Sequence, residues 1–344
     1  MSSRTLKAPF PWFGGKSTVA AQVWQRFGKV RNYIEPFFGS GAMLLGRPQP
    51  FEGLETVNDA DGMVANFWRA LQADPEAVAH YADWPVNEND LHARHAWLVE
   101  QRETLTARLE GDPDYHDARI AGWWCWGLCC WIGGGFCSGK GPWRRIQNEG
   151  SEWVLAKADN GDAGRGVNRK RPHLGDGLGV NRQRPHLGDG QGVKRQSEND
   201  LLGYMHALAD RLRNVRVCCG DWSRVCGPSP TVKQGLTAVF LDPPYSAEAG
   251  RDGELYATEN LTVAHDVRAW CLDCGDNPKI RIALCGYEGE HEALERAGWT
   301  VEAWKTQGGY GKLSDGQGLV NAGRERIWYS PHCIKTHLLL HFGD

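Results

Sequence analysis

The feature of this 344-residue sequence that most restricts its fold is a recurring order of short apolar segment, turn and helical pattern. Residues 32–35 run into the glycine-rich turn 37–41, and residues 55–57 run into Asn58-Asp59 and a helical pattern that reaches residue 71. This order is typical of a parallel sheet whose strands are joined by helices. We therefore expect an α/β fold with a doubly wound, mostly parallel sheet.

The C-terminal half continues the same order after Ser197, which precedes a helical pattern. Three apolar segments are expected to be buried strands: 215–219, 237–241 and 279–284. Residues 300–304 and 326–329 are expected to form a closing antiparallel strand pair.

The middle of the chain departs from this order. From about residue 72 to 135 the pattern is helical, and we expect its tryptophans to be mostly core residues: Trp123, Trp124, Trp126 and Trp131. Residues 166–178 (GVNRKRPHLGDGL) are repeated as 179–191 (GVNRQRPHLGDGQ), and a third copy begins at 192. A period of 13 residues rich in Gly and Pro, without an apolar face, indicates a loop insertion. We expect a mainly helical central insertion.

Three motifs carry the chemistry, in this order along the chain: Pro11-Trp12-Phe13-Gly14-Gly15-Lys16, Glu35-Pro36-Phe37-Phe38-Gly39-Ser40-Gly41 and Asp242-Pro243-Pro244-Tyr245. A Gly-x-Gly turn alone is weak evidence for nucleotide binding. An Asp-Pro-Pro-Tyr segment directly after a buried strand is much more specific, because two prolines stiffen the loop and leave its carbonyl groups free to accept hydrogen bonds.

The three motifs and their order resemble the Dam-type family of S-adenosylmethionine-dependent DNA adenine-N6 methyltransferases. The resemblance covers residues 7–71 and about 198–332. It implies a Rossmann-like methyltransferase fold, S-adenosylmethionine as cofactor and double-stranded DNA as partner. It further implies a catalytic domain formed by residues 1–71 and 198–344, with residues 72–197 as the target recognition insertion that contains the repeats.

The resemblance also implies roles for individual residues. The catalytic group is the loop Asp242, Pro243, Pro244 and Tyr245. The expected cofactor-binding residues are Trp12, Lys16, Glu35, Phe37, Gly39, Gly41, Asp59, Asp221 and Asp242. Lys16 is expected to pair with the methionine carboxylate, Asp59 with the ribose hydroxyls and Asp221 with the adenine amino group of the cofactor. A strand-end aspartate is also a common helix N-cap, and this interpretation stays open, above all for Asp221.

The loop suits an exocyclic amine as substrate. The N6 lone pair of adenine is delocalised into the ring, so the amine is a poor nucleophile. The Asp242 carboxylate and the Pro243 carbonyl are expected to accept the two N6 hydrogens and to aim the lone pair at the methyl group. Tyr245 is expected to stack on the adenine after the base leaves the helix.

Other functions remain open from the residues alone. The same loop chemistry serves methylation of cytosine N4 or of an RNA base. A catalytically silent DNA-binding protein is an alternative of another class, although Asp242 and Tyr245 argue against it. No metal is expected, because Cys271-x-x-Cys274 has no second pair at zinc spacing and follows the pattern of a helical core face.

DNA contacts require cationic side chains in local patches, because the formal net charge of the whole chain is −3. The candidates are Lys140, Arg144 and Arg145, together with the repeats. Between Arg165 and Arg195 there are eight Lys or Arg and two Asp, a local charge of +6. These repeats are either a solvated linker or a phosphate-contacting loop.

Composition and cysteine usage predict a cytoplasmic protein. The first eleven residues lack the apolar run of a secretory signal, and the eleven cysteines fall mostly in apolar surroundings, as expected of reduced thiols. The uncharged stretch 120–139 contains six glycines, and we expect a buried helix there rather than a membrane span. Restriction protection with a cognate endonuclease is a possible role, which the sequence does not decide.

Overall fold

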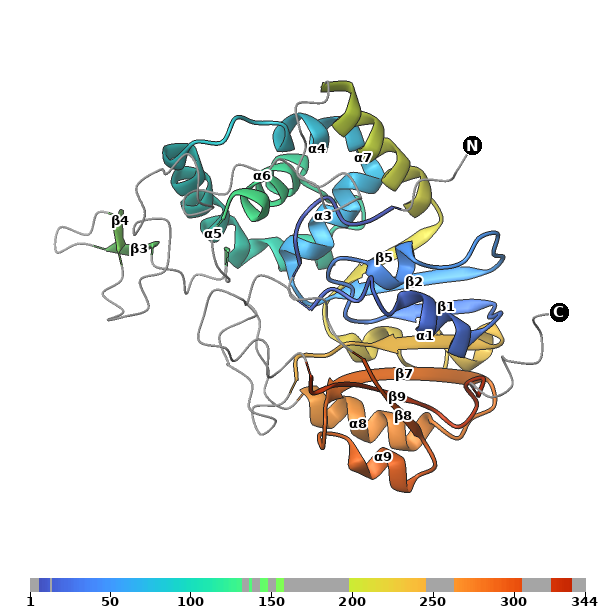
Figure 1. Cartoon of the computed structure of the whole chain (residues 1–344). Helices are drawn as coiled ribbons and strands as arrows, with labels where there is room; N and C mark the ends of the chain where they lie inside the picture. Colours follow the sequence, from blue (N-terminus) through green and yellow to red (C-terminus); the bar gives the residue numbers. More distant parts are fainter. Residues whose placement is uncertain are drawn as a thin grey trace. The chain divides into compact units, whose positions relative to one another are not determined.

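The computed structural model describes residues 6–12, 14–131, 136–137, 143–147, 153–157, 198–245, 263–304 and 323–335, and for 143–147, 153–157 and 198–200 the backbone alone. The chain divides into two compact units (Figure 1). We call residues 1–11, 60–213 and 254–258 the helical unit, and residues 12–59, 214–253 and 259–344 the sheet unit.

The sheet unit is built on seven strands, drawn side by side in Figure 1. They are β1 (Asn32–Glu35), β2 (Leu54–Asp59), β5 (Val215–Cys219), β6 (Thr237–Leu241), β7 (Ile280–Tyr287), β8 (Thr300–Ala303) and β9 (Glu325–Tyr329). Their order is β5-β2-β1-β6-β7-β9-β8. The first five are parallel, and β9 runs antiparallel to both β7 and β8. The predicted mostly parallel sheet with a closing antiparallel pair is confirmed.

Helices cover both faces of this sheet, so the predicted double winding is also confirmed. They are α1 (Ala20–Phe27), α2 (Ala42–Leu45), α8 (Val263–Cys274) and α9 (Glu292–Arg296), with the short 3-10 helices η3 (Trp222–Val225) and η4 (Val232–Gln234). Because successive strand residues point to opposite faces, Ile34 of β1 joins the core beneath α8 and α9. Its neighbour Tyr33 instead contacts Trp24 of α1, with ring centroids 4.8 Å apart.

The core beneath α8 and α9 draws alternate residues from further strands. Val239 and Leu241 of β6, and Trp328 of β9, lie in the same buried cluster as Val267 and Cys271 of α8. Cys271 is therefore a core residue, as its helical pattern predicted.

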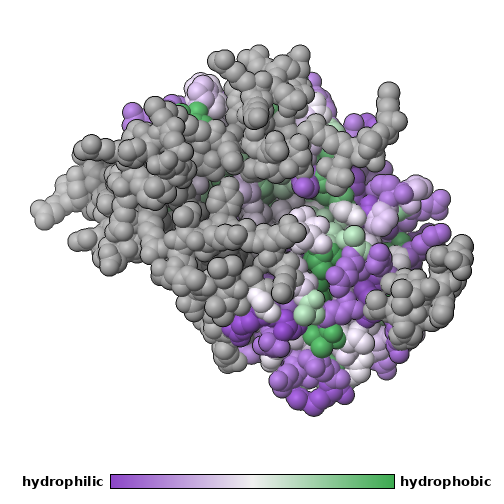
Figure 2. Space-filling model, in the orientation of Figure 1, coloured by the Kyte–Doolittle hydropathy of each residue, from purple (hydrophilic) through white to green (hydrophobic). Residues whose placement is uncertain are grey.

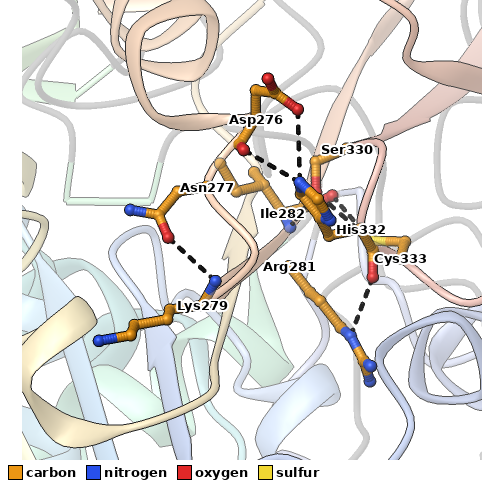
Figure 3. A network of polar contacts seen from close by, with 8 residues as sticks. All are labelled: Asp276, Asn277, Lys279, Arg281, Ile282, Ser330, His332 and Cys333. Carbon is orange, nitrogen blue, oxygen red and sulfur yellow. Dashed lines mark hydrogen bonds and ion pairs between the residues drawn. The ribbon is translucent and has the colours of Figure 1, made fainter.

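A polar network connects the amino-terminal end of β7 to the segment that follows β9 (Figure 3). The Ser330 hydroxyl accepts a hydrogen bond from the Ile282 backbone amide at 2.9 Å, and Arg281 Nε donates to the His332 carbonyl at 3.0 Å. The His332 ring lies 3.0 Å from the carbonyl oxygen of Asp276. These contacts hold the end of β9 against β7 and so fix the register of the antiparallel strand.

The helical unit contains α3 (Gly62–Ala73), α4 (Pro75–Ala82), α5 (Glu88–Gly111), α6 (Ala118–Cys130) and α7 (Glu198–Leu212), and the hairpin strands β3 (Trp143–Gln147) and β4 (Trp153–Lys157). Four of the helices begin at a side chain that accepts a backbone N–H of the first turn: Asp61, Asp74, Asn87 and Asp117. Such caps satisfy amides that the helix itself leaves unpaired. The predicted mainly helical character of the central region is confirmed.

Aromatic rings fill the core of the helical unit. Phe10 contacts Phe67 of α3 and Trp124 of α6 edge to face, with centroids 5.1 and 5.0 Å apart. Trp126 and Trp131 are also buried, whereas Trp123 is half-buried. The expected core role therefore holds for three of the four tryptophans.

Large hydrophobic side chains are exposed only singly among the described residues: Leu54, Trp84, Leu272 and Val301. On the face in Figure 2 the coloured surface is mostly hydrophilic, with small separate hydrophobic areas. Of the helices in the described part of the chain, none combines the length and the apolar character that a membrane crossing requires.

Candidate active site

The predicted site residues of the sheet unit follow the carboxyl ends of four parallel strands. Glu35 ends β1, Asp59 ends β2, Asp221 comes two residues after β5, and Asp242 directly follows β6. The carboxyl ends of parallel strands lie at one edge of a sheet, where α/β proteins bind ligands. The fold therefore brings these four carboxylates to the same edge.

Asn58 joins two of the loops at this edge, although no motif in the sequence had singled it out. Its buried side-chain amide donates to the Pro36 carbonyl at 3.1 Å and to the Gly220 carbonyl at 2.9 Å. It thus connects the loop after β1 with the loop after β5. The only signal in the sequence was its place beside Asp59 at the end of a strand.

Gly39 lies directly beneath the Trp12 indole. Its φ is +48°, and a Cβ atom there would stand 2.6 Å from Trp12 Nε1. The Gly39 amide donates to Asp59 Oδ2 at 2.9 Å. Glycine is therefore required at this position both by the backbone conformation and by the close approach of the indole. Three residues that the sequence singled out separately, Trp12, Gly39 and Asp59, form one contact group.

Gly41 and Phe37 complete the loop after β1. Gly41 adopts φ +64° and stands at the N-cap of α2. The Phe37 ring stacks on Trp222, with centroids 6.3 Å apart and ring planes at 27°. The loop after β1 therefore contains both an aromatic ring, that of Phe37, and the N-terminus of α2.

Asp221 is an N-cap in this structure. Its side chain accepts a hydrogen bond from the Ser223 amide at 2.9 Å, at the start of η3, and its side chain is exposed. The alternative that stayed open for this residue is therefore observed. A contact with the cofactor remains a prediction.

Glu35 is buried under the same edge. Tyr33 donates its hydroxyl to Glu35 Oε2 at 2.7 Å. Burial raises the pKa of Glu35 well above its usual value, although the hydrogen bonds from Tyr33 and from the Leu44 amide act in the opposite direction. Both residues point toward the face covered by α1, since they are two positions apart on one strand.

Lys16 lies inside the sheet unit rather than on a surface. Its ammonium is 2.7 Å from Asp242 Oδ2 and donates to the Gly14 carbonyl at 2.8 Å. Burial alone lowers the pKa of a lysine, but the negative charge of Asp242, with a smaller effect of Glu325, holds the pKa of Lys16 well above its usual value. The first and third motifs thus meet in a salt bridge.

The loop Asp242, Pro243, Pro244 and Tyr245 directly follows β6, as predicted. The Tyr245 hydroxyl donates to Glu325 Oε2 at 2.7 Å and lies 3.4 Å from Asp242 Oδ1. Its ring meets the ring of Tyr287 at the end of β7, with centroids 4.6 Å apart. Burial, together with the charges of Asp242 and Glu325, raises the pKa of Tyr245, so the phenol keeps its proton at neutral pH.

Glu325 is a second site residue that no motif in the sequence had singled out. It begins β9, it is 7% exposed, and burial raises its pKa above the usual value despite the nearby Lys16 charge. In sequence it is one polar residue at the start of a closing strand. Only the pairing of β9 with β7 places it beside Tyr245.

The expected DNA-binding residues lie outside the part of the chain with described side chains. Lys140 and the 13-residue repeats are outside the described residues, and Arg144 and Arg145 are described by their backbone in β3 alone. Within the described residues, no group of three or more His, Cys, Asp or Glu side chains is arranged to hold a metal ion.

Comparison with known proteins agrees with the motifs. Residues 12–110 match the family described as D12 class N6 adenine-specific DNA methyltransferase. Two curated relatives are named DNA adenine methylase, from Vibrio cholerae serotype O1 strains Classical Ogawa 395 and El Tor Inaba N16961. Each is 31% identical over 85 residues, which is 24% of this chain and 30% of the relative. The matched region therefore spans under a third of either relative. Residues 12–110 are similar to the D12 class of N6 adenine-specific DNA methyltransferases, in agreement with the resemblance of the three motifs to the Dam-type family.

Proposed function

We propose that this protein transfers a methyl group from S-adenosylmethionine to the N6 amino group of adenine in duplex DNA. The observation that carries the proposal is the salt bridge of 2.7 Å between Lys16 and Asp242 at the carboxyl end of β6, beside Tyr245. A carboxylate fixed next to an aromatic ring offers a flipped adenine both a hydrogen-bond acceptor and a stacking surface. The match over residues 12–110 supports the same reaction.

The residues at the sheet edge suit S-adenosylmethionine chemically. The Asp59 carboxylate suits a ribose diol, and the backbone of Gly39 is already bound to it. The Phe37 ring and the N-terminus of α2 at Gly41 offer an aromatic surface and backbone donors in the same loop. Lys16 and Trp12 contribute a cation and an indole beside this loop, and Glu35 and Asp221 are the further expected contacts. When bound, the cofactor supplies an electrophilic methyl group.

The protein would act on adenine through position and charge. Asp242 and the carbonyl of Pro243 accept the two N6 hydrogens, which localises the nitrogen lone pair and aims it at the methyl group. Lys16 pairs with Oδ2 of Asp242 and so holds the carboxylate in place. Pro243 and Pro244 hold the loop in one conformation. Stacking on Tyr245 contributes roughly 1–3 kcal/mol and helps to offset the cost of removing the base from the helix.

We also propose that catalysis and DNA recognition are carried out by different parts of the chain. Residues 1–71 and 198–344 form the catalytic domain, and residues 72–197 form the insertion that recognises DNA. Lys140, Arg144 and Arg145 are the proposed phosphate contacts, since phosphate binding supplies most of the affinity of such proteins. A cytoplasmic location and a partner restriction endonuclease remain predictions.

The test is transfer of tritium from labelled S-adenosylmethionine to unmethylated DNA, followed by nucleoside analysis. Label recovered as N6-methyladenine supports the proposal. Label recovered as N4-methylcytosine would mean that the loop acts on the cytosine amine instead. Transfer to RNA alone would mean that the substrate is an RNA base. Tight DNA retention with cofactor binding and no transfer assigns the protein to the catalytically silent class.

A further inference from the structure

Three groups outside the family motifs could have a further role: the arginine–tryptophan cluster of α5 and α6, the buried His291, and Glu325. Glu325 is the group whose contacts lead directly to the reacting atoms. A role for Glu325 rests on the proposed methyl transfer and extends it.

The sheet register explains why a carboxylate stands at this point. Glu325 pairs with Tyr287 at the carboxyl end of β7, because β9 runs antiparallel to β7. Along β9, Glu325, Ile327 and Tyr329 point to one face, and Trp328 points into the core beneath α8. The first residue of β9 therefore lies at the same edge of the sheet as the loop after β6.

The Tyr245 hydroxyl connects Asp242 to Glu325 through two successive oxygen–oxygen contacts. Asp242 Oδ1 is 3.4 Å from the Tyr245 hydroxyl, and that hydroxyl is 2.7 Å from Glu325 Oε2. The other Asp242 oxygen, Oδ2, is occupied by Lys16 at 2.7 Å. Asp242 thus has one oxygen tied to a cation and one directed toward the phenol.

The proposed reaction releases a proton from the adenine N6, beside Asp242. The nitrogen lone pair forms the new N–C bond while the S–C bond breaks and its electron pair stays on sulfur. The nitrogen then holds one proton more than the neutral product keeps. Asp242, hydrogen-bonded to the amine, is the first group to receive that proton.

Asp242 is poorly placed to keep the proton. A proton that stayed on Asp242 would cancel the charge that pairs with Lys16 at 2.7 Å, and passing the proton on restores this ion pair. Lys16 carries its full complement of protons and cannot accept another. Glu325 is buried, and burial favours its protonated form despite the Lys16 charge and the hydrogen bond from Tyr245.

We propose that Glu325 receives the proton released at N6, by way of Asp242 and the Tyr245 hydroxyl. Asp242 passes a proton to the Tyr245 oxygen as Tyr245 passes its own proton to Glu325, so Tyr245 is unchanged and Glu325 ends as a carboxylic acid. Glu325 loses the proton to solvent once the product has left. Glu325 touches neither substrate nor cofactor and acts through Tyr245.

The ionisation of Glu325 is set by the groups that face it from the neighbouring elements. These are Lys16 ahead of α1, Asp242 and Tyr245 after β6, and Glu290 after β7. Glu325 must be ionised to accept a proton. Because its pKa is raised, the rate of transfer is expected to fall as the pH drops through a value above the ordinary glutamate range.

The decisive variant is Glu325→Gln, tested in the full-length protein. A glutamine oxygen still accepts the hydrogen bond of Tyr245 and so keeps its ring in place, but it cannot take a proton. We expect single-turnover transfer to unmethylated plasmid DNA to slow roughly a hundredfold, within the range of general acid–base catalysis, and to lose the acid limb assigned to Glu325. The matched control is Glu292→Gln on α9, an exposed side chain that should leave rate and pH profile unchanged.

Two further measurements keep the test independent of the activity of one variant. Tyr245→Phe should slow transfer to a similar extent, and the double variant should be no slower than either single one, because both break the same route. A 13C titration of glutamate-labelled protein, without cofactor, should show a carboxyl with a raised pKa that is absent from Glu325→Gln, while the raised pKa of Glu35 is seen in both proteins.

Glu325→Gln with the wild-type rate and acid limb would overturn the proposal, as would a Glu325 carboxyl that titrates in the ordinary range. If the double variant instead slows transfer by the product of the two single effects, Tyr245 and Glu325 act independently. That result would also overturn the proposal. Failure of the proposed methyl transfer itself is a different result, since then the wild-type protein would transfer no label.

Discussion

At the scale of single residues, the closest approach at the site is the Trp12 indole over Gly39. We expect Gly39→Ala to reduce the unfolding free energy by about 1–3 kcal/mol, because the new methyl group meets Trp12 Nε1 at 2.6 Å and the backbone is left-handed. Gly289→Ala is the matched control, since Gly289 also has positive φ but no atom within 4 Å of the added Cβ. Urea unfolding of both variants measures the difference. Equal reductions would mean that backbone strain alone matters and that the Trp12 contact does not.

His291 gives a prediction about acid stability. It is fully buried against Trp328, and burial, helped by the Arg268 charge, lowers its pKa from 6.5 to about 3. Between these two values the unfolded chain binds a proton that the folded protein does not. The contribution of the neutral His291 to the free energy of unfolding is therefore complete above pH 6.5. As the pH falls toward 3, the free energy of unfolding decreases by roughly 1.4 kcal/mol per pH unit.

The check is urea unfolding of the wild-type protein and of His291→Leu at several pH values from neutral to acid. We expect the difference in unfolding free energy between the two proteins to move in favour of the variant as the pH falls. A difference that stays constant would mean that His291 is protonated inside the folded protein, contrary to the effects of its burial and of the Arg268 charge.

The sequence singled out most of the candidate site residues but not the side chains that they contact. Lys16 was expected to meet a cofactor carboxylate, and in the structure it pairs with Asp242, 226 positions away in the printed sequence. Asp221 acts as an N-cap, which local sequence also permitted. Asn58 and Glu325 were missed because their roles arise from loops and strands that meet only in the folded sheet.

At the scale of secondary-structure elements, the packing of α4 against α6 depends on one glycine. A Cβ on Gly122 of α6 would stand 2.4 Å from Tyr81 Cβ and 2.8 Å from the Val78 carbonyl, so neither neighbour can move away easily. We expect Gly122→Ala to cost about 1–3 kcal/mol. Gly203→Ala, inside α7 with open space around it, should instead stabilise by roughly 0.5–1 kcal/mol. Thermal or urea unfolding that moves both variants in the same direction would contradict this packing.

The strands were predicted more accurately than the helix ends. Residues 32–35, 215–219 and 237–241 are strands with the predicted bounds, because each is a short, mostly apolar or β-branched segment that ends at turn residues. Residues 16–27 have the apolar spacing of a helix in the sequence, with Val19, Val23 and Phe27 on one face, but the helix begins only at Ala20. The salt bridge of Lys16 with Asp242 and its bond to Gly14 hold the preceding residues in a turn, and this tertiary effect is invisible in a local pattern.

At the scale of the whole molecule, the distribution of charge limits where the proposed DNA substrate can bind. The chain has a net charge of −3, so affinity for a polyanion must come from restricted cationic segments. We expect the triple variant Lys140→Ala, Arg144→Ala, Arg145→Ala to bind duplex DNA more weakly. The slope of log affinity against log salt should fall by up to about 0.9 for each phosphate that the variant no longer neutralises. Arg296→Ala, an exposed cation on α9, is the control. An unchanged salt slope would assign DNA binding to another segment, such as the repeats.

The central claim is that Asp242, held in place by its salt bridge with Lys16, is the group that prepares the adenine amine for transfer. The most direct measurement is single-turnover tritium transfer to adenine by wild-type protein and by Asp242→Asn, with cofactor binding measured on both. Asparagine keeps the shape of the side chain but lacks the charge. We predict cofactor binding by both proteins and transfer by the variant at least roughly a hundredfold slower. Transfer by Asp242→Asn at the wild-type rate would contradict the claim.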